Sequence, residues 1–82
     1  MKEIREEHRR FLQAAYDEAD GTPGARVHRD DVMRASKISE ISEYEASAEF
    51  HTWVGTIDNV SDDFTTFTLT SKGVETTERE SK

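Results

Sequence analysis

The stretch 42–73 most constrains the fold of this chain, because it carries a helix start, a hairpin and a stop in close succession. Ser42 and Glu45 have the spacing of a capping box, in which the hydroxyl and the carboxylate each accept the backbone N–H of the other residue. Gly55 suits the left-handed position at which many helices end. The sequence therefore predicts a helix over 42–54.

The apolar residues of this helix predict which of its sides is buried. Ala46, Phe50 and Trp53 are spaced by four and three residues, so they lie on one helical face. Trp53 is the largest of them, and we expect it at the centre of the core. Ile41 precedes the cap, and we expect it to pack on Ala46 as a hydrophobic staple.

Two strands are predicted after this helix, over 56–60 and 64–69, with a short polar turn between them. Phe67 and Leu69 alternate with threonines, a pattern typical of a strand with one buried face. Phe64 is out of phase with this alternation. We therefore expect Phe64 to lean over the turn or to mark a bulge.

The first half of the chain predicts two helices and a short strand. One apolar stripe runs through 2–18, as in an amphipathic helix, and a glycine- and proline-rich loop follows at 21–24. A minimal strand is predicted over 25–28. Asp30 is then placed to cap a second helix that ends near Lys37.

The length of 82 residues and the absence of cysteine predict one small domain that is stabilised by its core alone. We expect this domain to occupy residues 1–75. Val74 is the only apolar anchor beyond the last strand, so the acidic tail 76–82 is expected to be frayed.

Two phrases resemble a known family. Trp53-Val54-Gly55-Thr56-Ile57, followed at hairpin distance by Leu69-Thr70-Ser71-Lys72-Gly73-Val74-Glu75, resembles the third helix, wing and post-wing segment of small prokaryotic winged helix-turn-helix proteins. The resemblance implies an α+β fold with a three-helix core and a small antiparallel β-sheet or wing. The implied order is helix, strand, helix, helix, strand, strand, with the strand at 25–28 pairing at the base of the wing.

The resemblance also implies a DNA-binding domain of a transcription regulator. Helix 42–54 would lie in the major groove of duplex DNA, and the wing 57–69 would contact its backbone. Winged regulators often pair through their first or last helix, so a homodimer is a further expectation. The candidate DNA contacts are Arg26, Arg29, Arg34, Lys37, Tyr44, Ser47, Ala48, His51 and Asn59.

The charge of the chain favours a second hypothesis. Eighteen acidic residues against eleven basic ones give a net charge of −7, the opposite of the usual nucleic-acid-binding balance. The predicted outward face of helix 42–54 has no lysine or arginine, and Asp62 and Asp63 at the wing tip would repel phosphates. The alternative is an acidic winged helix that acts as a protein-protein interaction module without binding DNA.

The few lysines and scattered acidic residues are also compatible with a protein from the high-salt cytoplasm of a halophile such as a haloarchaeon. Dissolved cations would screen an acidic surface there, and this keeps the DNA-binding hypothesis open.

The sequence predicts neither an enzyme nor a metal site. The serines lie at caps and turns, no glycine-rich phosphate loop follows a strand, and the three histidines are far apart. His8 is predicted to be a helix-surface residue. We expect no catalytic residue and no cofactor.

Apolar runs fall short of the roughly 20 residues that span a bilayer, and the first residues are charged. A cytoplasmic protein without a membrane partner is therefore expected.

Overall fold

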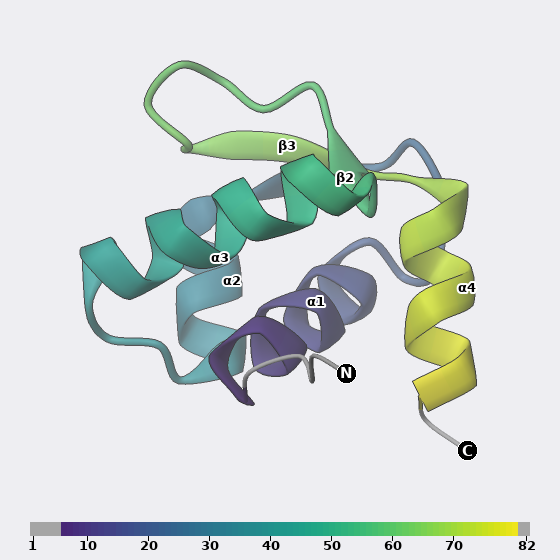
Figure 1. The fold of residues 1–82 in the computed structure, drawn as a ribbon, viewed down its shortest axis with the longest axis horizontal. Helices are drawn as coiled ribbons and strands as arrows, with labels where there is room; N and C mark the ends of the chain where they lie inside the picture. Colours follow the sequence, from purple (N-terminus) through teal and green to yellow (C-terminus); the bar gives the residue numbers. More distant parts are fainter. Residues whose placement is uncertain (1–5, 81–82) are drawn as a thin grey trace.

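The computed structural model describes residues 6–80, which form an α+β fold (Figure 1). The order α1-β1-α2-α3-β2-β3 agrees with the predicted order, and a fourth helix follows it. The helices and strands are α1 (Glu6–Glu18), β1 (Arg26–His28), α2 (Arg29–Ser36), α3 (Ile41–Val54), β2 (Ile57–Asp58), β3 (Thr66–Leu69) and α4 (Ser71–Glu80). The predicted first helix began at residue 2, and its start lies outside the described residues.

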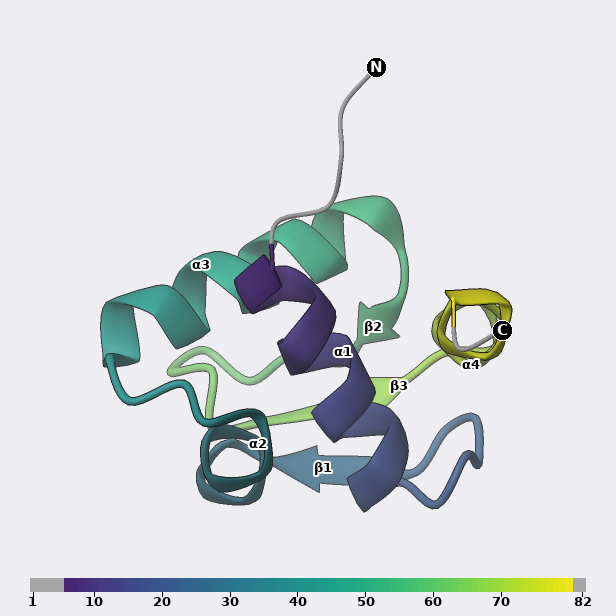
Figure 2. The same cartoon turned by 90° about the horizontal axis from the view of Figure 1, so that it is seen from below.

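The three strands form one antiparallel sheet with β3 in the centre, in the order β1-β3-β2 (Figure 2). Val27 of β1 pairs with Phe67, and Ile57 of β2 pairs with Leu69. All four side chains are buried, so one face of the sheet belongs to the core. The predicted pairing of the first strand at the base of the hairpin is confirmed.

The two hairpin strands are shorter than predicted. Asn59 and Phe64 adopt positive φ angles of 53° and 62°, which extended strands do not allow. The ladder therefore ends before Asn59 on one side and begins only at Thr66 on the other. Residues 59–65 form a connecting segment that we call the β2–β3 loop.

The core is centred on Phe11 of α1. The Phe11 ring is fully buried and lies 5.3–5.4 Å, between ring centroids, from the rings of Tyr44, His51 and Phe67. α1 packs against each of the other three helices. The apolar stripe predicted for this helix is confirmed within the described residues, where Phe11, Leu12, Ala15 and Ala19 are buried.

The buried face of α3 is not the predicted one. Ala46 is exposed, Phe50 is half-buried, and Trp53 is 84 % exposed, so the predicted place of Trp53 at the core centre is wrong. The other stripe is buried instead, and its polar side chains form hydrogen bonds with groups of α1 and of the β2–β3 loop. The buried residues of α3 are Tyr44, Ser47, Ala48 and His51.

The predicted start of this helix is also wrong. α3 begins at Ile41, preceded by Glu40 without a side-chain cap, and the N–H of Tyr44 donates to the carbonyl of Glu40 at 3.1 Å. Ser42 therefore lies inside the first turn, and no capping box forms. Ile41 is 47 % exposed rather than stapled to the helix, and Ile38 of the preceding turn is the buried residue. The predicted helix end at Gly55 is confirmed, with a φ of 88°.

The second helix starts without the predicted cap. His28 occupies the N-cap position with no side-chain hydrogen bond, and Asp30 lies within the first turn. The N–H of Arg29 instead donates to the carbonyl of Thr65 at 2.7 Å, so the β2–β3 loop supports the start of α2.

The predicted frayed tail is a helix as far as Glu80, and the predicted boundary at residue 75 falls inside it. The N–H of Gly73 donates to the Thr70 hydroxyl at 3.0 Å, which caps α4. The Tyr16 hydroxyl of α1 donates to the Glu78 carboxylate at 2.9 Å and holds α4 against α1. The expectation is therefore wrong for residues 76–80, whereas 81–82 lie outside the described residues.

Candidate interaction surface

The structure removes four of the candidate DNA contacts from the surface. Tyr44, Ser47, Ala48 and His51 lie on the buried side of α3, with side chains that are 0–1 % exposed. Their predicted placement on an outward recognition face is wrong, because the helix is rotated so that its other side faces solvent.

Tyr44 connects α3 to the β2–β3 loop. Its ring packs on Phe11 in the core, and its hydroxyl donates to the backbone carbonyl of Phe64 at 2.5 Å. Burial raises the pKa of Tyr44 far above its ordinary value, so the hydroxyl stays protonated and able to donate.

His51 connects α3 to α1 and carries no charge at neutral pH. Its Nε2 lies 2.8 Å from the carbonyl oxygen of His8, which can only accept, so Nε2 bears the hydrogen. Its Nδ1 lies 2.8 Å from the Thr56 hydroxyl and accepts from it. Burial lowers the pKa of His51 to about 4. His51, a candidate DNA contact, is therefore a neutral core residue.

His8 is less exposed than predicted. Its ring stacks on Phe50 with centroids 4.5 Å apart, and its Nδ1 lies 2.8 Å from the hydroxyl of Ser47. His8 therefore belongs to the seam between α1 and α3.

The basic candidates lie on β1 and α2. Arg26, Arg34 and Lys37 are exposed, and Arg29 is half-buried. The carboxylates of Asp30 and Asp31 lie 3.4 Å from the guanidinium groups of Arg29 and Arg34, respectively. The fifth surface candidate, Asn59, is exposed, and its amide donates to the Thr68 hydroxyl at 3.2 Å.

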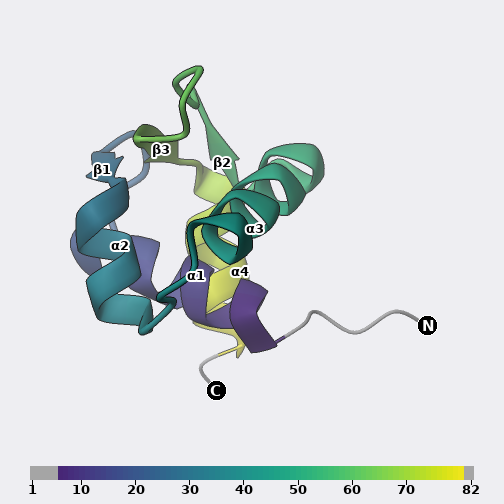
Figure 3. The same cartoon turned by 90° about the vertical axis from the view of Figure 1, so that its left-hand side faces the viewer.

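The charges of the chain are segregated, a signal that the sequence-based reasoning missed. Between Ile38 and Ser71 there are seven acidic residues and no lysine or arginine, whereas the rest of the chain has eleven of each sign. The whole net charge of −7 therefore lies on the part that contains α3, β2, the β2–β3 loop and β3. Figure 3 shows α3 and the more basic α2 on opposite sides of α1. The seven residues are Glu40, Glu43, Glu45, Glu49, Asp58, Asp62 and Asp63.

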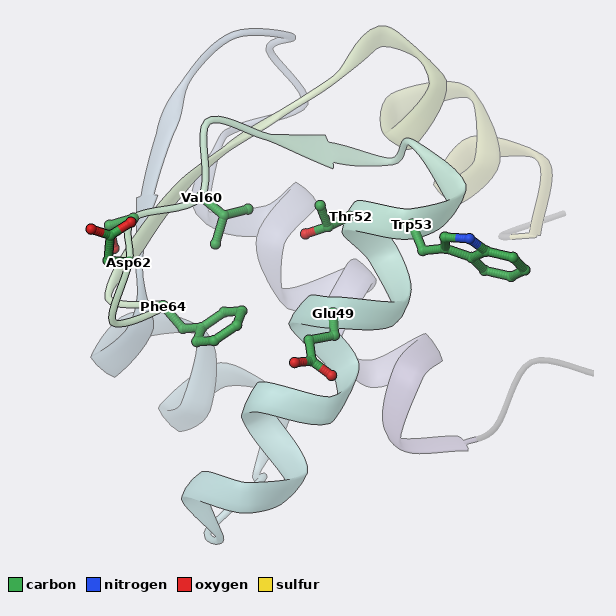
Figure 4. Close-up of a pocket in the computed structure, with 7 residues that line it drawn as sticks. Glu49, Thr52, Trp53, Val60, Asp62 and Phe64 are labelled. Atoms are coloured by element: carbon green, nitrogen blue, oxygen red, sulfur yellow. The ribbon is translucent and has the colours of Figure 1, made fainter.

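A groove of about 430 Å³ separates the exposed side of α3 from the β2–β3 loop (Figure 4). Figure 4 shows Phe64 pointing from the loop toward α3, with Val60 above it, whereas the Trp53 indole projects outward at the far end. Phe64 and Val60 are half-buried and pack on the core. The groove is lined by Glu49, Thr52, Trp53, Val60, Ser61, Asp62 and Phe64.

The loop wall of this groove is held by Asp63. Its Oδ1 accepts hydrogen bonds from the Thr65 hydroxyl at 2.6 Å and from the Ser61 hydroxyl at 2.9 Å. These hydrogen bonds lower the pKa of Asp63 to about 2, and the bond from Thr65 has the largest effect. Phe64 has a positive φ and its ring points from the loop toward α3, so it does not lean over the turn as the first of the two alternatives predicted, and β3 begins only at Thr66.

Trp53 is the most prominent apolar group on this surface. Among the described residues, Trp53 and Ile41 are the large apolar side chains that remain exposed, and both belong to α3. Trp53 lies one helical turn after Glu49, and Figure 4 shows the Glu49 carboxylate on the side of the loop and the indole projecting outward at the end of the groove.

Within residues 6–80, no three histidine or acidic side chains lie close enough together to hold a metal ion, and every buried side-chain N or O atom has a hydrogen-bond partner. No helix in this range has the length and apolar character needed to cross a membrane. Neither a protein-family model, nor a curated protein, nor a solved structure matches the chain.

Proposed function

We propose that this domain is a winged helix that acts as a protein-protein interaction module, with α3 and the β2–β3 loop as its binding surface. The element order and the sheet order β1-β3-β2, with the hairpin β2–β3 as the wing, support this architecture. The observation that carries the function is the 84 % exposure of Trp53 beside an apolar groove.

The exposed indole favours binding because it leaves a large apolar group in water. An aromatic side chain buries about 150–250 Å² when it is covered, which is worth roughly 4–6 kcal/mol at about 25 cal/mol per Å², before the costs of association. Tryptophan is also among the residues that most often dominate binding energy at protein interfaces. A covered Trp53 would therefore supply a strong apolar contact at the end of the groove.

The charge of the same surface favours a protein over duplex DNA. Glu49 and Asp62 lie on the two walls of the groove, and both would repel phosphates. DNA affinity depends on lysine and arginine side chains that replace condensed counterions. The lysine and arginine residues of this domain lie instead outside the stretch from Ile38 to Ser71, and Arg29 and Arg34 are each paired with an aspartate.

Site-specific photo-crosslinking tests this function. A photo-reactive amino acid at Glu49 should form a covalent adduct with a discrete protein in cells that naturally produce the chain. The same amino acid at Glu75, which is exposed on α4 away from the groove, is the matched control and should give no such adduct. Nuclease-sensitive adducts at Glu49 would instead support the DNA-binding regulator, and identical adducts at both positions would contradict a specific surface.

A further inference from the structure

The geometry points to the class of partner that the groove between α3 and the β2–β3 loop accepts: a short peptide segment that carries lysine or arginine next to a large apolar side chain. This inference rests on the proposed function and specifies it. The apolar side chain would enter the groove beside Phe64 and Val60. The cationic side chain would pair with the Glu49 carboxylate at the edge of that groove.

The first step is charge complementarity. Glu49 lines the groove from α3, and Asp62 lines it from the β2–β3 loop. No lysine or arginine lines the groove. The surrounding stretch from Ile38 to Ser71 adds five more acidic residues. A surface of one sign attracts the opposite sign and rejects its own, so a basic segment is favoured over an acidic one.

The same charge argues against a second copy of the chain. A two-fold symmetric dimer through this surface would place each acidic patch against its own equivalent. The resulting like-charge contacts are costly, so the occupant must be a different, basic chain.

The second step is the shape of the groove. Its volume of about 430 Å³ lies within the roughly 300–1,000 Å³ of typical ligand sites, and Phe64 and Val60 give it an apolar floor that rests on the core. The Tyr44 hydroxyl and the Asp63 carboxylate fix the loop wall. A floor that is fixed before binding loses little conformational freedom when an apolar side chain enters.

The third step is the pair formed by Glu49 and Trp53. These residues lie four positions apart and share one face of α3, and both line the groove. A lysine or arginine that pairs with the Glu49 carboxylate gains from the opposite charge, and its alkyl stem covers apolar surface of the exposed indole. An acidic or purely apolar partner does not gain from the opposite charge, which makes this end of the groove selective for lysine or arginine.

Synthetic peptides test the inference directly, because Trp53 is the only tryptophan of the chain and its fluorescence reports on the groove. The probes are a lysine–leucine peptide, the same peptide with glutamate for lysine, and the same peptide with serine for leucine. The lysine–leucine peptide should shift the Trp53 emission to shorter wavelength and bind tightest. The lysine–serine peptide should bind more weakly, and the glutamate–leucine peptide should not bind.

Variants separate the groove from general attraction by charge. Combining Glu49→Gln with Asp62→Asn should weaken lysine–leucine binding by about tenfold, the order expected when close charge pairs are removed. Combining Glu18→Gln with Glu75→Gln removes the same charge outside the groove and should leave binding unchanged. Equal weakening by both double variants, or equal binding of the lysine and glutamate peptides, would overturn the inference.

The two proposals fail in different ways. A protein adduct at Glu49 without any response to the lysine–leucine peptide would leave the interaction module standing and overturn the partner class. If neither an adduct nor a peptide response is found, both proposals are overturned. Amide shifts of α3 residues with duplex DNA at low salt would overturn them in favour of the DNA-binding regulator.

Discussion

The buried His51 of α3 donates its Nε2 hydrogen to the backbone carbonyl of His8 in α1, 2.8 Å away. This bond joins α3, which carries the proposed binding surface, to α1, whose Phe11 lies at the centre of the core. The bond by itself would favour a charged ring, but burial outweighs it and keeps the ring neutral at neutral pH, so that Nδ1 accepts from the Thr56 hydroxyl. The stability of the domain is therefore linked to the protonation of one histidine.

Acid should destabilise the protein well above the range in which carboxylates titrate. The folded protein lowers the pKa of His51 from 6.5 to about 4, so only the unfolded chain binds this proton between those values. Stability should be complete above pH 6.5 and should fall by up to about 3 kcal/mol as the pH drops to 4. Urea unfolding at pH 7 and pH 4.5 measures the loss. His51→Gln should lose less stability between these pH values than the wild type, whereas substitution of the exposed His28 by glutamine should leave the loss unchanged. Equal losses in the wild type and both variants would contradict the link between His51 and acid stability.

The corrected core predicts opposite results for two aromatic residues. Phe11→Ala should cost about 3–5 kcal/mol, because it empties the centre of the core. Trp53→Ala should change stability by no more than about 0.5 kcal/mol, because its side chain is largely in solvent. Thermal and urea unfolding followed by circular dichroism measures both. A large loss for Trp53→Ala would mean that α3 is rotated as the apolar stripe predicted.

Gly73 should not tolerate a side chain, although it lies in a helix. A Cβ atom there would meet the backbone oxygen of Thr56 at 2.3 Å. Alanine normally favours a helix by about 1 kcal/mol over glycine, but this clash should reverse the sign and cost about 1–3 kcal/mol net. Urea unfolding of Gly73→Ala tests this, with Glu75→Ala on the same helix as the control. A stabilised Gly73→Ala would show that α4 does not pack closely on Thr56.

Added salt should raise the melting temperature, because the whole net charge of −7 lies between Ile38 and Ser71. Dissolved ions screen such repulsion, and the screening length falls from about 10 Å at 0.1 M salt to about 3 Å at 1 M. Combining Glu45→Gln with Glu49→Gln should reduce the rise more than combining Glu18→Gln with Glu75→Gln, which removes charge where basic residues balance it. A melting temperature that stays flat up to molar potassium chloride would remove the salt-adapted interpretation, which is still a prediction.

The parts of the fold that the sequence predicted are those with several agreeing local signals. The stripe around Phe11 and Ala15, the glycine- and proline-rich loop at 21–24 and the helix end at Gly55 each depend on nearby residues. The structure confirms all three.

The rotation of α3 could not be decided locally, because its sequence contains two stripes at helical spacing. Phe50 and Trp53 are the larger apolar pair, and they favoured the wrong stripe. Tyr44 and His51 are buried instead because their polar atoms reach the carbonyls of Phe64 and His8, partners distant in the sequence. Only the folded chain supplies those partners.

The candidate surface was missed for the same reason. Trp53 was assigned to the core, so the groove beside it had no visible apolar anchor. The segregation of acidic residues between Ile38 and Ser71 was present in the sequence and could have indicated a surface of one charge. It could not indicate the groove, because the groove depends on the positive φ of Phe64 and on the direction of its ring from the loop toward α3.

The hydrogen bond from Tyr44 to Phe64 has a consequence for the speed of recognition. It ties the two walls of the groove together, so no opening or closing step needs to precede the arrival of a partner. The association rate should then depend on diffusion and charge alone, and should fall steeply with ionic strength. The lifetime of the complex should instead be set by how well the partner covers Trp53, so substitutions there would act on dissociation and leave the encounter rate nearly unchanged.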